Sequence, residues 1–178
     1  TDCDPAAGGG GASTYFSKPA WQTGAGVPAD GARDVPDVSF NSSAEHDGYL
    51  VYTSGKRSVY GGTSAATPVF AGVLTLLNQY LLATGAQSSA GLGNVNPRLY
   101  ALAQQPNVNV FHDITSGDNV VNVTCGTKST HNCSPGSFGY SAAQGYDLAT
   151  GLGSVDAFAL VMAWPRQNSA LTLANAVV

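Results

Sequence analysis

The stretch that decides the fold of this chain is Gly61-Gly62-Thr63-Ser64-Ala65-Ala66-Thr67-Pro68. It runs into an apolar segment, residues 69–82, which predicts a buried helix that stops near Gly85. Proline favours the first turn of a helix, so we place Pro68 there. Glycines permit a sharp turn, and the helix N-terminus would stabilise an oxyanion, so Ser64 is a candidate nucleophile. The alternative is a plain loop with a capping serine.

The composition indicates one globular domain with few charges. The chain has 178 residues, of which 43% are hydrophobic and only 10% are charged, against about 25% in an average protein. So few titrating groups suit a protein that works in acidic surroundings. The net charge of -4 and the absence of a basic cluster argue against nucleic-acid binding. Thr75, Asn78 and Gln79 interrupt the apolar run, so we expect no membrane span.

The cysteines and sequons favour the secretory pathway. Cys125 and Cys133 flank a polar loop and could close a small disulfide ring, which leaves Cys3 over. A zinc site made of Cys125, His131 and Cys133 is the weaker alternative because it lacks a fourth ligand. The chain starts without Met or a signal peptide, so we expect a processing site at its beginning. Candidate glycosylation sites are Asn41, Asn122 and Asn132.

Local patterns place the remaining elements. β-prone pieces at 49–53 and 58–61 surround the turn at 54–56, and a short apolar run at 35–40 is typical of a strand entry. Asn96-Pro97 opens a short helix that continues to Ala103. Ser154 is expected to cap a last helix over 155–164, with Asp156 in its first turn.

A long Gly- and Asn-rich stretch at 113–153 carries a second chemical signal. Asp113 and Asp147 are far apart in sequence, and Ile114, Ala143 and Gly145 beside them could offer backbone carbonyls. Two carboxylates and several carbonyls form an oxygen-only site suited to calcium. The alternative is that both aspartates cap turns.

A serine nucleophile needs a general base, and the sequence offers none in a recognisable pattern. His112 adjoins Asp113, His131 lies in the loop between Cys125 and Cys133, and His46 lies in a polar stretch.

Four motifs in order resemble the sedolisins, a family of acid-acting serine-carboxyl peptidases related in fold to subtilisin. The first is a Ser-x-x-Phe-x-x-Pro-x-Trp-Gln stretch after a glycine run. The second is an Arg-x-x-Pro-Asp-Val-Ser segment, the third is the nucleophile motif, and the fourth is a calcium-loop signature. The first motif is matched by Ser13, Phe16, Pro19, Trp21 and Gln22, and the second by residues 33–39. The third is matched by residues 62–65 with Pro68, and the fourth by Asp113-Ile114 with residues 145–153.

The resemblance implies an α/β fold with a subtilisin-like parallel sheet and flanking helices. Residues 1–178 would be its C-terminal portion, with a nucleophile segment at about 58–85 and a calcium-binding region at about 111–153. One calcium ion would be held by the Asp113 and Asp147 carboxylates and by the carbonyls of Ile114, Ala143 and Gly145, although the family often has glycine at position 143.

The resemblance also implies a mechanism that this chain cannot complete. Ser64 would attack the scissile peptide bond, while a glutamate base and two aspartates lie upstream in the family and have no match here. We therefore expect the C-terminal chain of a two-chain member, with Cys3 as the candidate for a disulfide to the N-terminal companion chain. A secreted protein, or one in an acidic vesicular or lysosomal compartment, fits this expectation. An inactive calcium-stabilised homologue and a His-dependent subtilisin-type hydrolase are the alternatives.

Overall fold

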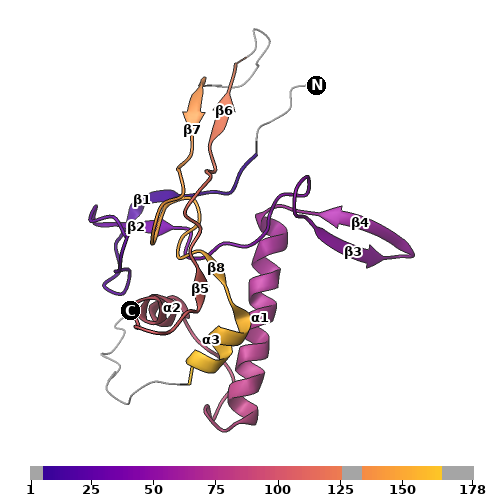
Figure 1. Cartoon of the computed structure of the whole chain (residues 1–178), viewed down its shortest axis with the longest axis vertical. Helices are drawn as coiled ribbons and strands as arrows, with labels where there is room; N and C mark the ends of the chain where they lie inside the picture. The colour runs from indigo at the N-terminus through magenta and orange to yellow at the C-terminus, as the bar shows by residue number, and fades with distance from the viewer. Residues whose placement is uncertain (1–5, 126–133, 166–178) are drawn as a thin grey trace.

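The computed structural model describes residues 6–125 and 134–165 and contains three helices within them. The helices are α1 (Thr63–Ala83), α2 (Asn96–Ala103) and α3 (Ala157–Ala163). The strands are β1 (Gly11–Ser17), β2 (Ala32–Val35), β3 (Tyr49–Thr53), β4 (Lys56–Tyr60), β5 (Phe111–His112), β6 (Val121–Val123), β7 (Gly136–Phe138) and β8 (Ser154–Val155). Figure 1 shows their arrangement.

The described strands form antiparallel pairs, namely β1–β2, β3–β4, β5–β8 and β6–β7. A single parallel bridge within the described residues joins Ser39 to Ser154. This bridge places residues 37–39 beside β8, which pairs with β5 on its other side. A subtilisin-like parallel sheet is thus not completed by the described residues, and it stays a prediction.

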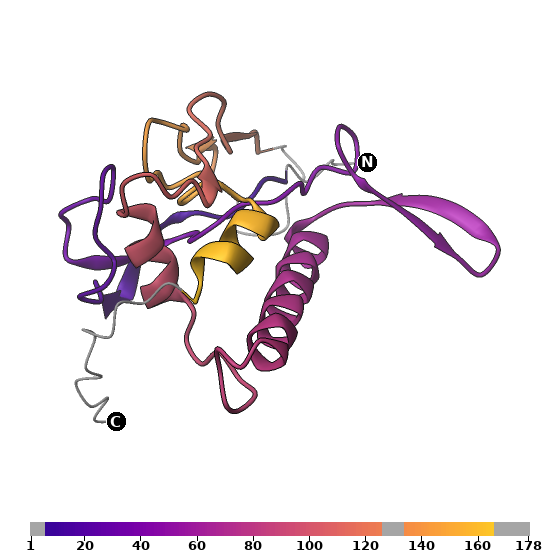
Figure 2. The ribbon, with the colours of Figure 1, turned by 60° about the horizontal axis from the view of Figure 1, so that its bottom comes forward.

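The hairpin expected around residues 54–56 is confirmed. Thr53 pairs with Lys56, and the loop residues Ser54 and Gly55 have φ values of 51° and 76°. Positive φ at both loop residues is the geometry of a type I′ turn, which matches the twist of the flanking strands. Both views show the β3–β4 hairpin projecting away from the rest of the chain (Figures 1 and 2).

Two helix boundaries differ from those expected. Helix α1 begins at Thr63, so Pro68 lies in its second turn and not in its first. Helix α3 begins at Ala157, because Asp156 caps it by accepting a hydrogen bond of 2.8 Å from the Ala159 N–H. Ser154, the expected cap, belongs to β8 instead. Helix α2 covers the expected residues.

The hydrophobic core lies where the three helices meet. Its buried members come from α1, from α2, from the residue before β5 and from α3: Leu77, Leu81, Leu99, Leu102, Val110, Leu160 and Ala163. Figure 2 shows α3 between α2 and α1. The core therefore uses only one face of α1.

Most of α1 is exposed, although its composition suits burial. Only Leu77 and Leu81 are buried, while Leu76 is 64% exposed, and Phe158 on α3 is 76% exposed. The expectation that α1 lies inside a larger structure is not met by the described residues. By length and composition α1 is also apolar enough to cross a membrane, with a mean hydropathy of 1.3. Thr75, Asn78 and Gln79 therefore do not exclude a membrane span by hydropathy alone.

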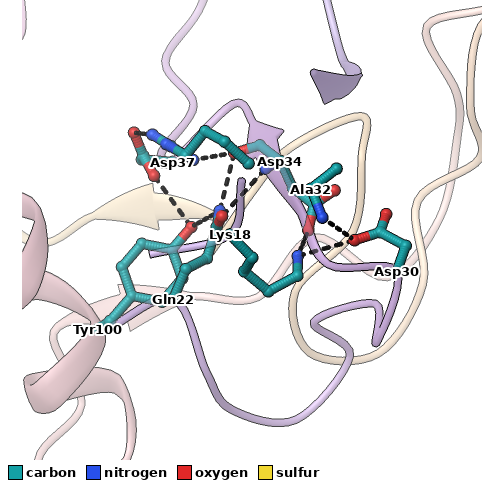
Figure 3. Close-up of polar contacts among 8 residues, drawn as sticks. Lys18, Gln22, Asp30, Ala32, Asp34, Asp37 and Tyr100 are labelled. Carbon is teal, nitrogen blue, oxygen red and sulfur yellow. Dashed lines mark hydrogen bonds and ion pairs between the residues drawn. The ribbon is translucent and has the colours of Figure 1, made fainter. Parts of the chain in front are cut away.

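A buried polar network fixes the first part of the chain to α2 (Figure 3). The Gln22 amide donates to the backbone carbonyl of Asp34 at 2.8 Å and to the Tyr100 hydroxyl at 2.9 Å. Its carbonyl accepts from the Asp34 N–H at 3.0 Å. Gln22, Asp34 and Tyr100 are all fully buried. The amide therefore replaces water at the Asp34 N–H and shares the Asp34 carbonyl with the Arg33 guanidinium.

Asp37 links this network to the C-terminal part of the chain. Its carboxylate accepts from the Tyr100 hydroxyl at 2.9 Å and from the Asn96 amide at 3.0 Å, and it pairs with Arg33. Burial raises the pKa of Tyr100, and the negative charge of Asp37 raises it further. The Tyr100 hydroxyl therefore stays protonated and donates to Asp37. The Asp37 carbonyl accepts from the Leu152 N–H at 2.9 Å.

Lys18 neutralises the buried Asp34 carboxylate. Its ammonium contacts Asp34 and lies 3.2 Å from Asp30. Desolvation lowers the pKa of Lys18, but the hydrogen bonds and charges of Asp34 and Asp30 outweigh it, and the pKa is raised overall. Lys18 thus stays charged beside Asp34 at neutral pH.

We predict that Gln22→Ala lowers the free energy of unfolding by about 2 to 4 kcal/mol, because the buried Asp34 N–H, Asp34 carbonyl and Tyr100 hydroxyl each lose one hydrogen bond. Denaturant unfolding of the protein that carries this chain measures it. The matched control is Gln79→Ala on the exposed surface of α1, which should change the value by less than about 0.5 kcal/mol. Equal stability of the Gln22 and Gln79 variants would contradict the role of the network.

Candidate active site

The turn before α1 depends on two glycines. Gly62 is the N-cap of α1 with φ 88° and ψ 157°, a conformation that other residues rarely adopt. Its N–H donates to the Ser42 carbonyl, which anchors the turn to the segment at 37–42. A side chain on Gly61 would clash with the backbone of Ser42 and Ala44. Glycine is thus required at position 62 by its backbone conformation and at position 61 by the close approach of another backbone.

Ser64 is the second residue of α1 and is exposed. The Gly62 carbonyl accepts the N–H groups of Ala65 at 2.9 Å and Ala66 at 3.3 Å. The first N–H groups of a helix have no intrahelical acceptor, so the Ser64 N–H is available to an anion at this end. Within the part of the chain that the structure describes, Ser64 Oγ makes no hydrogen bond. The serine is therefore presented and does not act as a cap.

Pro68 affects Ser64 directly, although not in the way expected. A helix bonds the N–H of each residue to the carbonyl four residues earlier, and proline has no N–H. Pro68 lies inside α1, so it leaves the carbonyl of Ser64 without its usual partner. The hydroxyl of Thr67 donates to the Thr63 carbonyl at 2.8 Å in the same turn.

Among the described residues, no histidine or carboxyl side chain forms a hydrogen bond with the Ser64 hydroxyl. His46 Nδ1 is 2.9 Å from Ser43 Oγ, and His112 Nε2 is 3.8 Å from Asp156. Each described histidine therefore contacts a group other than Ser64, and His131 lies outside the described residues. A base for Ser64 would have to come from elsewhere.

A pocket of about 460 Å³ opens next to the nucleophile turn, and no motif in the sequence predicts it. It lies between the segment at 36–42 and the first half of α1, where the rings of Phe40 and Phe70 are 5.6 Å apart. Ala149 and Thr150 close another side. This pocket arises from segments distant in sequence, which is why local patterns could not predict it.

Four of the predicted calcium ligands contact one another in two pairs, Asp113 with Gly145 and Asp147 with Ala143. Asp113 Oδ2 accepts from the Gly145 N–H at 2.8 Å, although the two residues are far apart in sequence. Asp147 Oδ2 accepts from the Ala143 N–H at 3.0 Å. Both carboxylates therefore border the loop at 143–147, and Ile114 follows directly after Asp113. Such an oxygen-only donor set fits a hard cation.

Asp147 also stabilises its own turn, as the alternative interpretation expected. Its Oδ1 accepts from the N–H groups of Ala149 at 2.9 Å and Thr150 at 2.7 Å, and its side chain is 7% exposed. The described residues contain no group of three or more acidic, histidine or cysteine side chains that could hold a metal. A calcium ion would therefore rely on backbone carbonyls for much of its coordination.

The remaining predicted sites are only partly described. Asn41 and Asn122 have exposed side chains, which is necessary for a glycan, whereas Asn132 lies outside the described residues. Cys125 takes part in a disulfide. Its expected partner Cys133 is outside the described residues, as is Cys3, so these pairings stay predictions.

Comparisons with known proteins find peptidases. Kumamolisin of a Bacillus species is 38% identical over 152 residues, which make up 82% of this chain and 23% of that protein. Physarolisin of Physarum polycephalum is 37% identical over 161 residues, 82% of this chain and 25% of that protein. No protein-family model matches the chain.

A solved structure agrees with these relatives. It is Pseudomonas sedolisin, a serine-carboxyl proteinase, in complex with two molecules of pseudo-iodotyrostatin. The match has a TM-score of 0.61 and 34% identity, and it covers 86% of this chain but 35% of the sedolisin chain. The described residues therefore have the fold of one part of that proteinase. The chain spans about a quarter of the length of kumamolisin and physarolisin, and it belongs to the sedolisin family.

Proposed function

We propose that this chain is the C-terminal part of an acid-acting serine-carboxyl peptidase in which Ser64 is the nucleophile. The observation that carries the proposal is the exposed Ser64 at the N-terminus of α1. The hydrogen bond from the Gly62 N–H to the Ser42 carbonyl holds this end of the helix in place. The relatives are peptidases, and the matching sedolisin is a serine-carboxyl proteinase. Peptide or protein would be the substrate.

Ser64 Oγ would attack the scissile carbonyl and form an acyl-enzyme, which water then hydrolyses. The Ser64 N–H and the positive end of α1 would stabilise the oxyanion. A companion segment would supply the base that removes the Ser64 proton, because no base among the described residues is hydrogen-bonded to Ser64. That base would be a glutamate, and an aspartate of the same segment would donate to the oxyanion.

The acidic working range follows from these two carboxyl groups. The glutamate accepts a proton only when it is ionised, and the aspartate donates a hydrogen bond only when it is protonated. Both conditions hold together only at acidic pH. The low charge content of the chain, 10%, suits a secreted protein or an acidic compartment.

We also propose one calcium ion at Asp113 and Asp147, with the carbonyls of Ile114, Ala143 and Gly145. The ion would neutralise two carboxylates and join the loop after β5 to the loop at 143–147. Its role would be structural, since the described loop packs its turn at 147–151 against residues 36–37 and does not include Ser64.

The first prediction is that Ser64→Ala abolishes peptidase activity, with at least about a thousandfold loss in kcat, because the nucleophile is gone. The melting temperature should stay within about 2 °C, since the Ser64 side chain is exposed. Ser88→Ala, which removes another exposed serine hydroxyl, is the matched control and should keep full activity. Turnover retained in the Ser64 variant would refute the assignment.

The second prediction concerns pH. The value of kcat/KM should have its maximum at acidic pH and fall as the oxyanion aspartate loses its proton. Measuring kcat/KM against pH with a peptide substrate distinguishes the carboxyl mechanism from one that uses a histidine base. A maximum at neutral or alkaline pH would support a histidine base and exclude the carboxyl mechanism.

The third prediction concerns calcium. Saturating calcium should stabilise the protein by about 2.7 kcal/mol at a hundred times Kd, and a chelator should remove this effect. Asp113→Asn should lose the calcium response in a melting experiment. Asp118→Asn is the control, because Asp118 also accepts a loop N–H but is not a proposed ligand. An unchanged response in the Asp113 variant would exclude this site.

A further inference from the structure

Residues 23–26, which we call the strap, lie directly against the loop at 143–147. The Tyr146 N–H donates to the Ala25 carbonyl at 2.9 Å. A Cβ atom added to Gly26 would lie 2.2 Å from the Tyr146 carbonyl oxygen, and one added to Gly145 would lie 2.7 Å from the Ala25 oxygen. Neither position has room for a side chain, so the two backbones are in contact with nothing between them.

This contact fixes the direction of one predicted calcium ligand, the carbonyl of Gly145. That carbonyl and the Tyr146 N–H belong to the same peptide group, which is planar and trans. In a trans peptide the carbonyl and the N–H point in opposite directions. Because the Tyr146 N–H points at Ala25, the Gly145 carbonyl must point away from the strap. The preceding peptide is held as well, since the Gly145 N–H donates to Asp113 at 2.8 Å.

Helix α2 and the buried polar network hold the strap at both ends. The Gln104 amide, one residue after α2, donates to the Thr23 carbonyl at 3.1 Å and to the Thr23 hydroxyl at 3.3 Å. The Val27 N–H donates to the Gly24 carbonyl at 3.2 Å, which closes a turn. Directly before the strap, Gln22 belongs to the network of Figure 3. The strap therefore cannot shift without breaking these bonds.

The strap also borders a second pocket, of about 220 Å³, which Asp113 and Gly145 line together with Gln104. The pocket gives solvent a path to two of the predicted ligands. A strap that moved would therefore change both the direction of the Gly145 carbonyl and the access of water to it.

We propose that the strap is a positioning element that sets the calcium affinity of the site. The inference rests on the proposed function, in which a calcium ion binds between Asp113 and Asp147. A ligand carbonyl that already has its direction needs no reordering when the ion binds, so the affinity is higher. By linkage the bound ion must hold the strap in return, and with it the contact to α2.

Gly26→Ala tests the contact, and Gly31→Ala is its matched control. The two glycines have φ values of 84° and 76°, so alanine meets similar backbone strain at each. A Cβ atom at Gly31 has no neighbour within 4 Å, whereas at Gly26 it would meet the backbone of Tyr146. Titration calorimetry with calcium alone, on the intact protein after chelation, should give a Kd at least about tenfold higher for Gly26→Ala. The Kd of Gly31→Ala should stay within about twofold of the unaltered protein.

A milder pair of variants tests the anchor on α2. Gln104→Met keeps the length of the side chain but removes the amide that bonds to Thr23. Gln105→Met is its control, because the Gln105 side chain forms no hydrogen bond within the described part of the chain. Calcium should dissociate at least about threefold faster from the Gln104 variant, measured by stopped flow against a fluorescent chelator. The Kd should rise by the same factor.

The melting temperature in chelator separates positioning from a general loss of structure. A purely structural strap would lower this temperature in the Gly26 and Gln104 variants and leave their calcium Kd equal to that of the controls. Equal Kd values within either pair would therefore overturn the proposal and keep the calcium site. An unaltered protein that binds no calcium would overturn the strap and the calcium site together, and the Ser64→Ala variant tests the nucleophile separately.

Discussion

The structure depends most on the backbone of the segment at 37–42. One edge of this segment holds Leu152 and β8, and its far end holds the nucleophile turn through the bond between the Ser42 carbonyl and the Gly62 N–H. The Asp37 side chain fixes its start to α2 through Tyr100 and Asn96. Three separate parts of the chain therefore take their positions from a few extended residues.

This dependence explains why glycine stands at several contact points. A side chain at Gly61 would clash with Ser42 and Ala44, and one at Gly151 would clash with the backbone of Pro36 and Asp37. In both places another backbone passes too close for a Cβ atom. The glycines thus let the nucleophile turn and the 147–151 turn approach the same segment from two sides.

Local chemistry was sufficient to predict the elements with strong signals. The turn at Ser54-Gly55, the start of α2 at Asn96 and the grouping of Asp113 with the loop at 143–147 all agree with the structure. The start of the last helix was predicted wrongly. Ser154 pairs with His112 in the β5–β8 ladder, and Asp156 caps α3 instead. Tertiary pairing overrode a local preference there.

The pocket beside α1 and the buried role of Gln22 could not be predicted from local patterns. Both depend on contacts between residues far apart in sequence, such as Gln22 with Tyr100 and Phe40 with Phe70. The lack of a base beside Ser64 agrees with a chain that spans about a quarter of its relatives. Helix α1 has an apolar composition but little burial for the same physical reason, because the described residues cover only one of its faces.

The central claim is that Ser64 forms the acyl-enzyme, and trapping that intermediate tests it most directly. The native protein would be mixed with a peptide ester at acidic pH, quenched in denaturant within milliseconds, and mapped by mass spectrometry. The account predicts the acyl group on the peptide that contains Ser64. An active protein that carries the acyl group on another residue, or that turns over substrate with no covalent intermediate at any time, would contradict it.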